Sequence, residues 1–264
     1  MKKELVILLC TFSLFNLRCQ QTDHFPVTDL HIHLNGLTID AAAEKSKREH
    51  IRYGILASAG LGYKIHSDRQ IDSLLLVRKK YPQFYVGIQA EGREWVNMFS
   101  RECLKKLDYV VTDAMTFTDE KGRRNRIFIQ NETWIDDENQ FMDYYVKTIV
   151  DILNNEPINI YVNPTYLPVK IADKYDILWT NERMDKVISA AVKNGIAIEI
   201  NNRYKIPSEV FIKRAKEAGV KFTVGTNNNN ANFTGAEYAR EMIKKCGLTE
   251  KDFFLPATKN GIPR

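Results

Sequence analysis

The chain has 264 residues, of which 44% are hydrophobic and 27% are charged. This length and composition fit one large α/β domain or two small ones. The net charge of +5 is modest, and the sequence has no basic arm or basic-aromatic stripe, so we expect no nucleic-acid partner.

The first 19 residues have the pattern of an export signal. Lys2 and Lys3 precede an apolar segment, residues 5–17, that is too short to span a bilayer as a mature helix. Cys19 and the polar residues after it resemble the lipidation site of a bacterial lipoprotein, although Arg18 stands where a small residue is usual. We predict a signal at 1–19, lipidation of Cys19, and an exported domain at 20–264 anchored on the periplasmic or cell-surface side of a membrane. The alternative is a plain apolar N-terminal segment.

After the signal, short β-branched runs alternate with amphipathic stretches. Strands are predicted at 27–33, 52–57, 84–90, 108–113, 158–163, 197–201 and 221–225. Helices are predicted at 39–50, 68–80, 137–154, 181–194, 208–218 and 236–246. Thr180 and Gly195 are the expected start and stop signals of the fourth of these helices. The alternation predicts parallel βα units in a single domain, in which Cys103 and Cys246 are buried packing residues.

Polar side chains gather at the ends of the predicted strands. His31 and His33 are expected to share one face with Asp29, whereas Leu30 and Ile32 face the covering helices. The other polar strand ends are Gln89, Glu91, Asp113, Asn163, Glu199, Asn201, Thr226 and Asn227. A doubly wound sheet concentrates its chemistry at one switch point, whereas a barrel distributes it over most strand ends, so we predict a barrel of seven βα units.

This concentration of polar groups predicts a metal site. Burying so many polar groups without partners would cost about 1–3 kcal/mol each, so we expect them to face a shared cavity with a cation. Imidazole and carboxylate groups are suitable ligands for Zn²⁺, Mn²⁺ or Fe²⁺. A hydrogen-bonded histidine pair without metal is the alternative for His31 and His33. Asn163 is expected to form hydrogen bonds, and Glu199 either supports a metal ligand from behind or pairs with Arg203.

Several arginines follow the same strand ends. Arg93 comes after Glu91, and Arg126 lies in the loop beyond the fourth strand. Guanidinium groups bind phosphate or carboxylate in a bidentate manner, although each could instead pair with a neighbouring carboxylate. The predicted substrate-binding residues are Arg93, Arg203, Asn163, Asn201 and Arg126.

The motifs "DLHIH", "IEINN" and "VGTNN", together with the Glu91 strand, resemble those of the PHP (polymerase and histidinol phosphatase) superfamily over about the whole chain after the signal. The resemblance implies a distorted (β/α)7 TIM-like barrel with a metal cluster at the carboxyl ends of the strands, and often phosphoester hydrolysis. The implied metal ligands are His31, His33, Glu91, Asp113 and Asn227, with Asn163 beside a second metal. Family histidines are absent from "ASAG" and "GTNN", so the resemblance implies one or two ions and no third.

The sequence therefore predicts a metal-dependent hydrolase of a phosphoester or another anionic small molecule. Asp113 would act as the base, and Arg93 and Arg203 would neutralise developing charge. Two alternatives remain open: a non-catalytic barrel that binds an anionic or sugar ligand, and an amidohydrolase-type enzyme that cleaves C–N or ester bonds.

Overall fold

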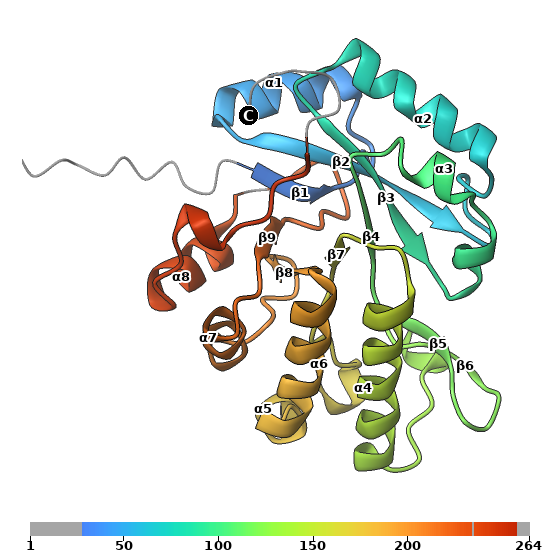
Figure 1. The fold of residues 1–264 in the computed structure, drawn as a ribbon, viewed down its shortest axis with the longest axis vertical. Helices are drawn as coiled ribbons and strands as arrows, with labels where there is room; N and C mark the ends of the chain where they lie inside the picture. Colours follow the sequence, from blue (N-terminus) through green and yellow to red (C-terminus); the bar gives the residue numbers. More distant parts are fainter. Residues whose placement is uncertain (1–27, 234, 258–264) are drawn as a thin grey trace, which may run out of the picture.

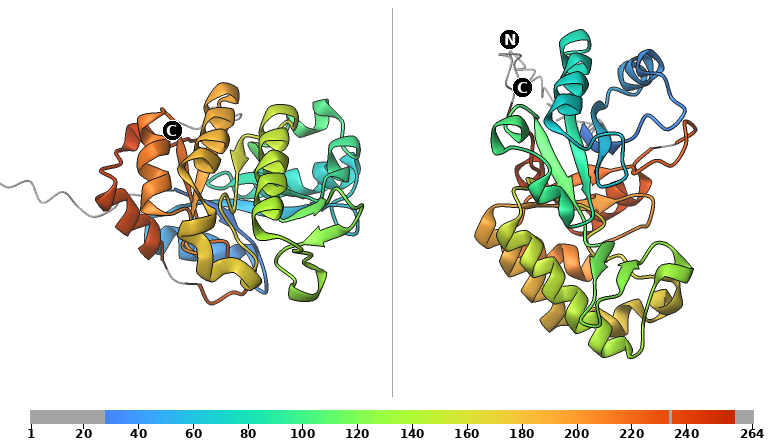
Figure 2. Two further views of the ribbon diagram at one scale, coloured as in Figure 1. Left: turned by 90° about the horizontal axis from the view of Figure 1, so that it is seen from below. Right: turned by 90° about the vertical axis from the view of Figure 1, so that its right-hand side faces the viewer.

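The computed structural model describes residues 28–233 and 235–257, which fold around a parallel sheet of seven strands. The nine strands in chain order are β1 (Thr28–Ile32), β2 (Arg52–Gly60), β3 (Tyr85–Glu91), β4 (Tyr109–Thr112), β5 (Thr116–Thr118), β6 (Arg124–Arg126), β7 (Ile160–Tyr161), β8 (Ala197–Asn201) and β9 (Phe222–Gly225). The large sheet has the order β1-β2-β3-β4-β7-β8-β9, so each of its strands pairs with the next one along the chain. Figures 1 and 2 show the helices arranged around the outside of these strands.

The helices connect successive strands, as the alternating pattern predicts. They are α1 (Ile39–Glu49), α2 (Asp68–Lys80), α3 (Arg101–Leu104), α4 (Glu138–Asn155), α5 (Tyr175–Leu178), α6 (Asn181–Asn194), α7 (Glu209–Glu217) and α8 (Glu237–Lys245), with short 3-10 turns at Glu94–Asn97, Gln130–Glu132, Val169–Lys174 and Glu250–Asp252. The Thr180 hydroxyl accepts a hydrogen bond from Arg183 N at the start of α6, and Gly195 ends that helix with φ 64°. Both predicted signals of this helix are confirmed.

The first and last strands of the sheet meet, so the barrel is nearly closed. Asn227 N, just after β9, donates to His31 O of β1 at 2.8 Å. The Asp29 carboxylate accepts hydrogen bonds from the backbone N–H of Thr226, at 3.1 and 3.2 Å, and from its hydroxyl. The predicted α/β barrel of seven parallel strands is confirmed in its architecture.

An apolar plug fills the interior of the barrel below its carboxyl end. It consists of buried side chains from β1, β2, β3, β4, β7 and β8 and the residue after β7, namely Leu30, Leu56, Tyr85, Tyr109, Val111, Ile160, Val162 and Ala197. The Tyr109 hydroxyl reaches across to donate to Leu30 O at 2.8 Å. A Cβ atom at Gly87 would lie 2.6 Å from Tyr109 O, so only glycine leaves room at this inward position. The plug fills the barrel interior with apolar side chains, and the polar side chains lie at the carboxyl ends of the strands.

A β-bulge in β1 changes which side chains face inward. Asp29 pairs with Tyr53 and Ile32 pairs with Ile55, so β1 has one residue more than β2 between the two pairs. Ile32 packs outward against α1 as predicted, but the prediction for Leu30 is wrong, because Leu30 lies in the plug. The prediction for Asp29 is also wrong, because its carboxylate binds Thr226 at the β1–β9 seam instead of sharing a face with the histidines.

The hairpin of β5 and β6 follows β4 and was not predicted. Thr116 pairs with Arg126 and Thr118 with Arg124 in an antiparallel two-stranded sheet. Each strand has only three residues, and β6 is entirely polar, so no apolar alternation marks it in the sequence.

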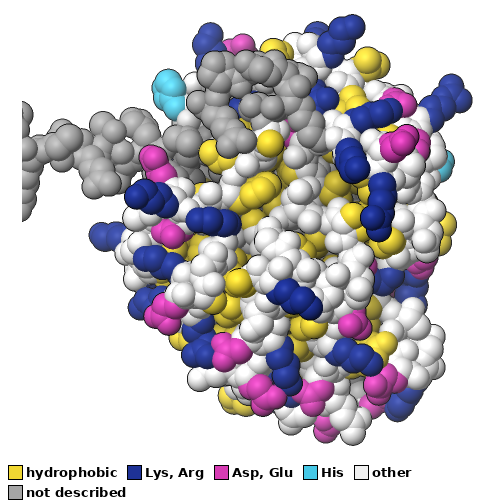
Figure 3. All heavy atoms as spheres, in the orientation of Figure 1, with side chains coloured by type: hydrophobic (Ala, Val, Ile, Leu, Met, Phe, Trp, Pro, Cys, Tyr) yellow, Lys and Arg dark blue, Asp and Glu magenta, His cyan; other side chains and the backbone are white. Residues whose placement is uncertain are grey.

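The remaining structural predictions concern the cysteines and the N-terminus. Cys103 and Cys246 are both buried and free, as expected. The predicted signal at 1–19, with Cys19, lies outside the described residues and stays a prediction. In the described part of the chain, no helix is long and apolar enough to cross a membrane. On the face shown in Figure 3, Lys and Arg side chains are interspersed with Asp and Glu.

Candidate active site at the carboxyl ends of the strands

A cavity of about 240 Å³ opens to solvent where the parallel strands end. It is lined by side chains at or just beyond the carboxyl ends of all seven strands of the barrel, and by a single residue after β6. They are His33, Asn35, Ser58, Tyr63, Gln89, Glu91, Asp113, Met115, Phe128, Asn163, Arg203, Tyr204, Asn227, Asn228 and Asn229. The carboxyl end of a βα barrel is where such a cavity carries function, because loops from every strand converge there.

Beneath the cavity, six side chains form a closed circuit of hydrogen bonds, which we call the polar ring. Its members, in the order of their contacts, are Glu199, His31, Gln89, Asp113, Asn163 and Asn201. His31 Nδ1 lies 2.6 Å from Glu199 Oε1, and His31 Nε2 lies 3.0 Å from Gln89 Oε1. Gln89 Nε2 donates to Asp113 Oδ2 at 3.4 Å.

The circuit closes through two asparagines. Asn163 Nδ2 donates to Asp113 Oδ2 at 2.8 Å, and Asn201 Nδ2 lies 2.9 Å from both Asn163 Oδ1 and Glu199 Oε2. Asn227 is not a member of the polar ring but contacts it, because its Nδ2 donates to Asn163 Oδ1 at 3.0 Å. Asn163 and Asn227 both have left-handed backbones, with φ 51° and 50°, a conformation that asparagine tolerates better than most residues. The buried polar groups therefore satisfy one another without a cation.

Glu199 and His31 form a buried ion pair within the ring. Both nitrogens of His31 face oxygen acceptors, so the imidazole donates from both positions and carries a positive charge. Burial acts to lower the pKa of His31, but the charge of Glu199 and the hydrogen bonds to Glu199 and Gln89 together outweigh it, and the pKa lies above the ordinary 6.5. Burial likewise acts to raise the pKa of Glu199, but the charge of His31 and the hydrogen bonds to the carboxylate together hold the pKa below the ordinary value.

Asp113 and Glu91 are two carboxyl groups of the same cavity in different surroundings. Asp113 is 3% exposed, and its Oδ1 accepts from Met115 N at 2.9 Å in addition to the two amides of the ring. The Glu91 side chain forms no hydrogen bond to another residue in the described part of the chain. Burial, followed by repulsion from Asp113, raises the pKa of Glu91 to about 8, and burial also raises the pKa of Asp113. Three donors surround Asp113 and favour its charged form, whereas the Glu91 side chain has none, so Glu91 is the favoured site for a proton of the pair.

His33 completes the titratable groups of the cavity. Its ring centroid lies 5.1 Å from that of His31, and the two planes are inclined by 69°. Burial and the positive charge of His31 lower the pKa of His33 to about 4. His33 is therefore a neutral imidazole at neutral pH, and it lines the same cavity as Glu91.

The side chains do not form a transition-metal site in this arrangement. Both nitrogens of His31 are used within the protein, and Gln89 rather than Glu91 contacts its ring. Among residues 28–233 and 235–257, no group of three His, Cys, Asp or Glu side chains is placed to hold a metal ion. The further donors, Gln89, Asn163 and Asn227, supply neutral amides, which suit Zn²⁺ or Fe²⁺ poorly. The five predicted ligands thus share one end of the barrel, but their amide-rich donor set fits Zn²⁺ or Fe²⁺ poorly.

The predicted arginines have different surroundings. Arg93 forms an ion pair with Glu156 at 2.7 Å, and its Nη2 donates to Asp113 O at 2.7 Å, so it supports the backbone beside the cavity. Arg126 pairs in a bidentate manner with Glu132, at 2.5 Å for Nη2 and Oε1. Arg203 lines the cavity with its guanidinium 5.0 Å from the Tyr204 ring. Of the three, Arg203 is the guanidinium available to a ligand.

The cavity is also lined by four residues that were not among the predicted site residues, namely Ser58, Tyr63, Phe128 and Tyr204. Tyr63 and Phe128 are 37% and 41% exposed. Ser58 lies near the end of β2, and the other three lie in the loops that follow β2, β6 and β8. The signal that the sequence holds for them is their position at or just beyond a strand end.

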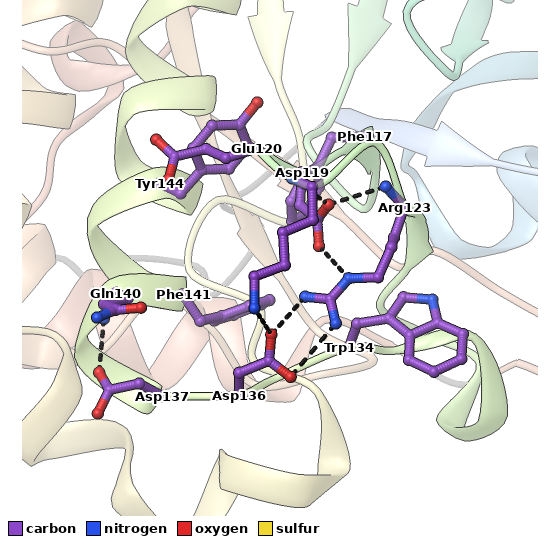
Figure 4. A pocket seen from close by; sticks show the side chains of 11 residues that line it. Phe117, Asp119, Glu120, Arg123, Trp134, Asp136, Asp137, Gln140, Phe141 and Tyr144 are labelled. Atoms are coloured by element: carbon purple, nitrogen blue, oxygen red, sulfur yellow. Dashed lines mark hydrogen bonds and ion pairs between the residues drawn. The ribbon is translucent and has the colours of Figure 1, made fainter.

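A second hollow, of about 70 Å³, lies outside the barrel between the β5–β6 hairpin and α4 (Figure 4). Its charged groups pair with one another: Asp136 contacts Lys121 and Arg123, each at 2.8 Å, and Arg123 also contacts Asp119 at 2.8 Å. Arg123 further lies 5.7 Å from the Trp134 ring. These mutual contacts make the hollow a structural cluster.

No protein-family model matches the chain, and no curated protein matches it. Among solved structures, the chain is similar to a Xaa-Pro dipeptidase with methionine bound in its active site, at 15% identity and a TM-score of 0.21. The match covers 78% of this chain and 42% of that one, so this chain spans less than half of its length. A likeness this distant assigns neither a family nor an activity.

Proposed function

We propose that the chain is a hydrolase that works by general acid–base catalysis in the cavity at the carboxyl end of the barrel. The observation that carries the proposal is the unequal carboxyl pair, in which Asp113 accepts three hydrogen bonds and Glu91 has a pKa raised to about 8. Pairs of titratable groups whose surroundings separate their pKa values are typical of acid–base sites.

The two carboxyl groups have complementary roles in this proposal. Glu91 donates its proton to the leaving group as the scissile bond breaks, and the Asp113 carboxylate takes a proton from the attacking water. The neutral imidazole of His33 binds substrate or orients that water. Arg93 holds the backbone carbonyl of Asp113 and acts as a positioning residue.

The charge of the cavity favours an uncharged or singly charged substrate. A phosphate monoester, the substrate class that the sequence resemblance implies, carries roughly two negative charges, which the Asp113 carboxylate would repel. Arg203 is the basic side chain that lines the cavity, and the donor set supplies no cation site to balance a dianion. The metal-dependent phosphoesterase is therefore the less supported form of the hydrolase prediction.

The test is a panel of nitrophenyl glycosides, esters, anilides and phosphates, assayed with chelator-treated protein over a range of pH. We expect turnover without added metal, and kcat/KM that falls as the pH rises through about 8, because Glu91 then loses the proton that it must donate. Turnover that requires Zn²⁺ or Mn²⁺, or that increases above pH 8, would contradict the proposal. Ligand binding without turnover of any class would instead favour the non-catalytic barrel.

A further inference from the structure

The cavity contains polar groups that the polar ring does not use. The hydroxyl groups of Ser58 and Tyr63 form no hydrogen bond to another residue within the described ranges, and neither does the Glu91 carboxyl group. Asn227 and Asn35 each use Nδ2 as a donor, to Asn163 Oδ1 and Asn228 O at 3.0 Å, so their Oδ1 atoms remain as acceptors. The free groups are therefore a mixture of donors and acceptors within one cavity.

Aromatic rings stand among these polar groups. Tyr63, Phe128 and Tyr204 come from three different loops and line the same cavity. Tyr166 packs edge-on against Tyr204, with ring centroids 4.8 Å apart, and this contact limits the orientations of the Tyr204 ring. Rings of this kind provide flat apolar surface, whereas their hydroxyl groups remain available for hydrogen bonds.

We infer that the cavity binds a pyranose-sized sugar, so that the bond cleaved is glycosidic; this inference rests on the proposed function. A sugar ring presents hydroxyl groups that both donate and accept, together with apolar C–H faces that fit aromatic rings. The volume of about 240 Å³ is small for a drug-sized ligand and suits a single sugar ring. The Asp113 carboxylate disfavours phosphorylated ligands, and a neutral sugar avoids that repulsion.

The reaction balances with the groups present. Water adds to the anomeric carbon as the bond from that carbon to the leaving oxygen breaks. Glu91 gives its proton to the leaving oxygen, Asp113 receives one proton from the water, and exchange with solvent restores both groups. The step requires no oxidant or reductant.

The test measures binding by titration calorimetry of the full chain with methyl glycosides of glucose, galactose and mannose, and with inorganic phosphate and a neutral dipeptide as comparators. We expect at least one methyl glycoside to bind, and Tyr63→Phe to weaken that binding by about 3- to 10-fold through the loss of one hydrogen bond. Tyr144→Phe is the matched control, because Tyr144 lies outside the barrel, and its hydroxyl donates to Thr118 O at 2.9 Å. This control is expected to bind as the wild type does.

The results separate the two proposals. Absence of binding by all methyl glycosides, or an unchanged affinity in Tyr63→Phe, would overturn the sugar inference. Hydrolysis of esters or anilides without sugar binding would overturn it too, and would leave the hydrolase proposal intact. Sugar binding without cleavage of any glycoside supports the sugar site, overturns glycosidic cleavage, and counts against the hydrolase.

Discussion

Replacing Glu91 with glutamine is expected to lower kcat by about 10²- to 10⁴-fold on any substrate that the protein turns over. Glutamine keeps the size and hydrogen-bonding capacity of the side chain but cannot give up a proton to a leaving group. The measurement is kcat and KM for wild type and Glu91→Gln at pH 6.5. Because glutamine is neutral like the protonated acid, KM should change by less than kcat.

Glu94→Gln is the matched control for this substitution. Glu94 is three residues further along the chain, and its carboxylate forms an exposed ion pair with Arg124, with side chains 41% and 47% exposed. We expect Glu94→Gln to keep wild-type turnover, since exposed ion pairs contribute little. A Glu91→Gln protein that retains most of its kcat would remove Glu91 from the role of acid.

Substituting His31 with alanine is expected to lower the free energy of unfolding by about 3–5 kcal/mol. The change leaves the Glu199 carboxylate, which is 0% exposed, without its positive partner, and it also opens the polar ring at Gln89. Urea denaturation monitored by circular dichroism measures the difference. His66→Ala is the control, because His66 is exposed on the loop after β2, and its loss should have little effect on stability.

The pH dependence of this difference tests the charge on His31. A raised His31 pKa stabilises the fold fully below the ordinary 6.5, and this contribution is lost as the pH rises through the folded value. A lowered Glu199 pKa stabilises the fold above the ordinary 4.5, and this contribution is lost as the pH falls through the folded value. The free energy of unfolding of the wild type should therefore exceed that of His31→Ala by the largest amount between about pH 4.5 and 6.5. A difference that is the same from pH 4 to pH 9 would mean that His31 is not a charged partner of Glu199.

The barrel was predictable because its strands and helices are marked locally. The helices predicted at 68–80 and 181–194 have the same bounds in the structure, and Thr180 caps the second as expected. The bulge in β1 left no such mark, because the pattern of alternating side chains in residues 29–33 fits a regular strand equally well. The extra residue becomes visible only when the pairing of β1 with β2 is known.

The location of the site was also predictable, but its internal pairing was not. Every strand end that the sequence marks as polar lies at one end of the barrel, because parallel strands bring their carboxyl ends together. The alternation of side chains predicts that Gln89 and Glu91 lie on the same face of the strand. In the structure only Gln89 forms a hydrogen bond with His31. A difference of two residues along a strand, roughly 7 Å, decides which side chain completes the ring. Whether buried carboxylates are balanced by a cation or by amide donors depends on distances of this kind, and composition does not encode them.

The central claim is that Glu91 is a protonated acid in a site that needs no cation, and carbon-13 NMR titration of the glutamate side-chain carboxyl groups tests it most directly. The spectrum of wild type is compared with that of Glu91→Gln to assign the resonance, with chelator present and then with one equivalent of Zn²⁺. We predict a Glu91 pKa of about 8 under both conditions. A pKa that falls below the ordinary 4.5 when Zn²⁺ is added, with one ion retained per chain, would contradict the account.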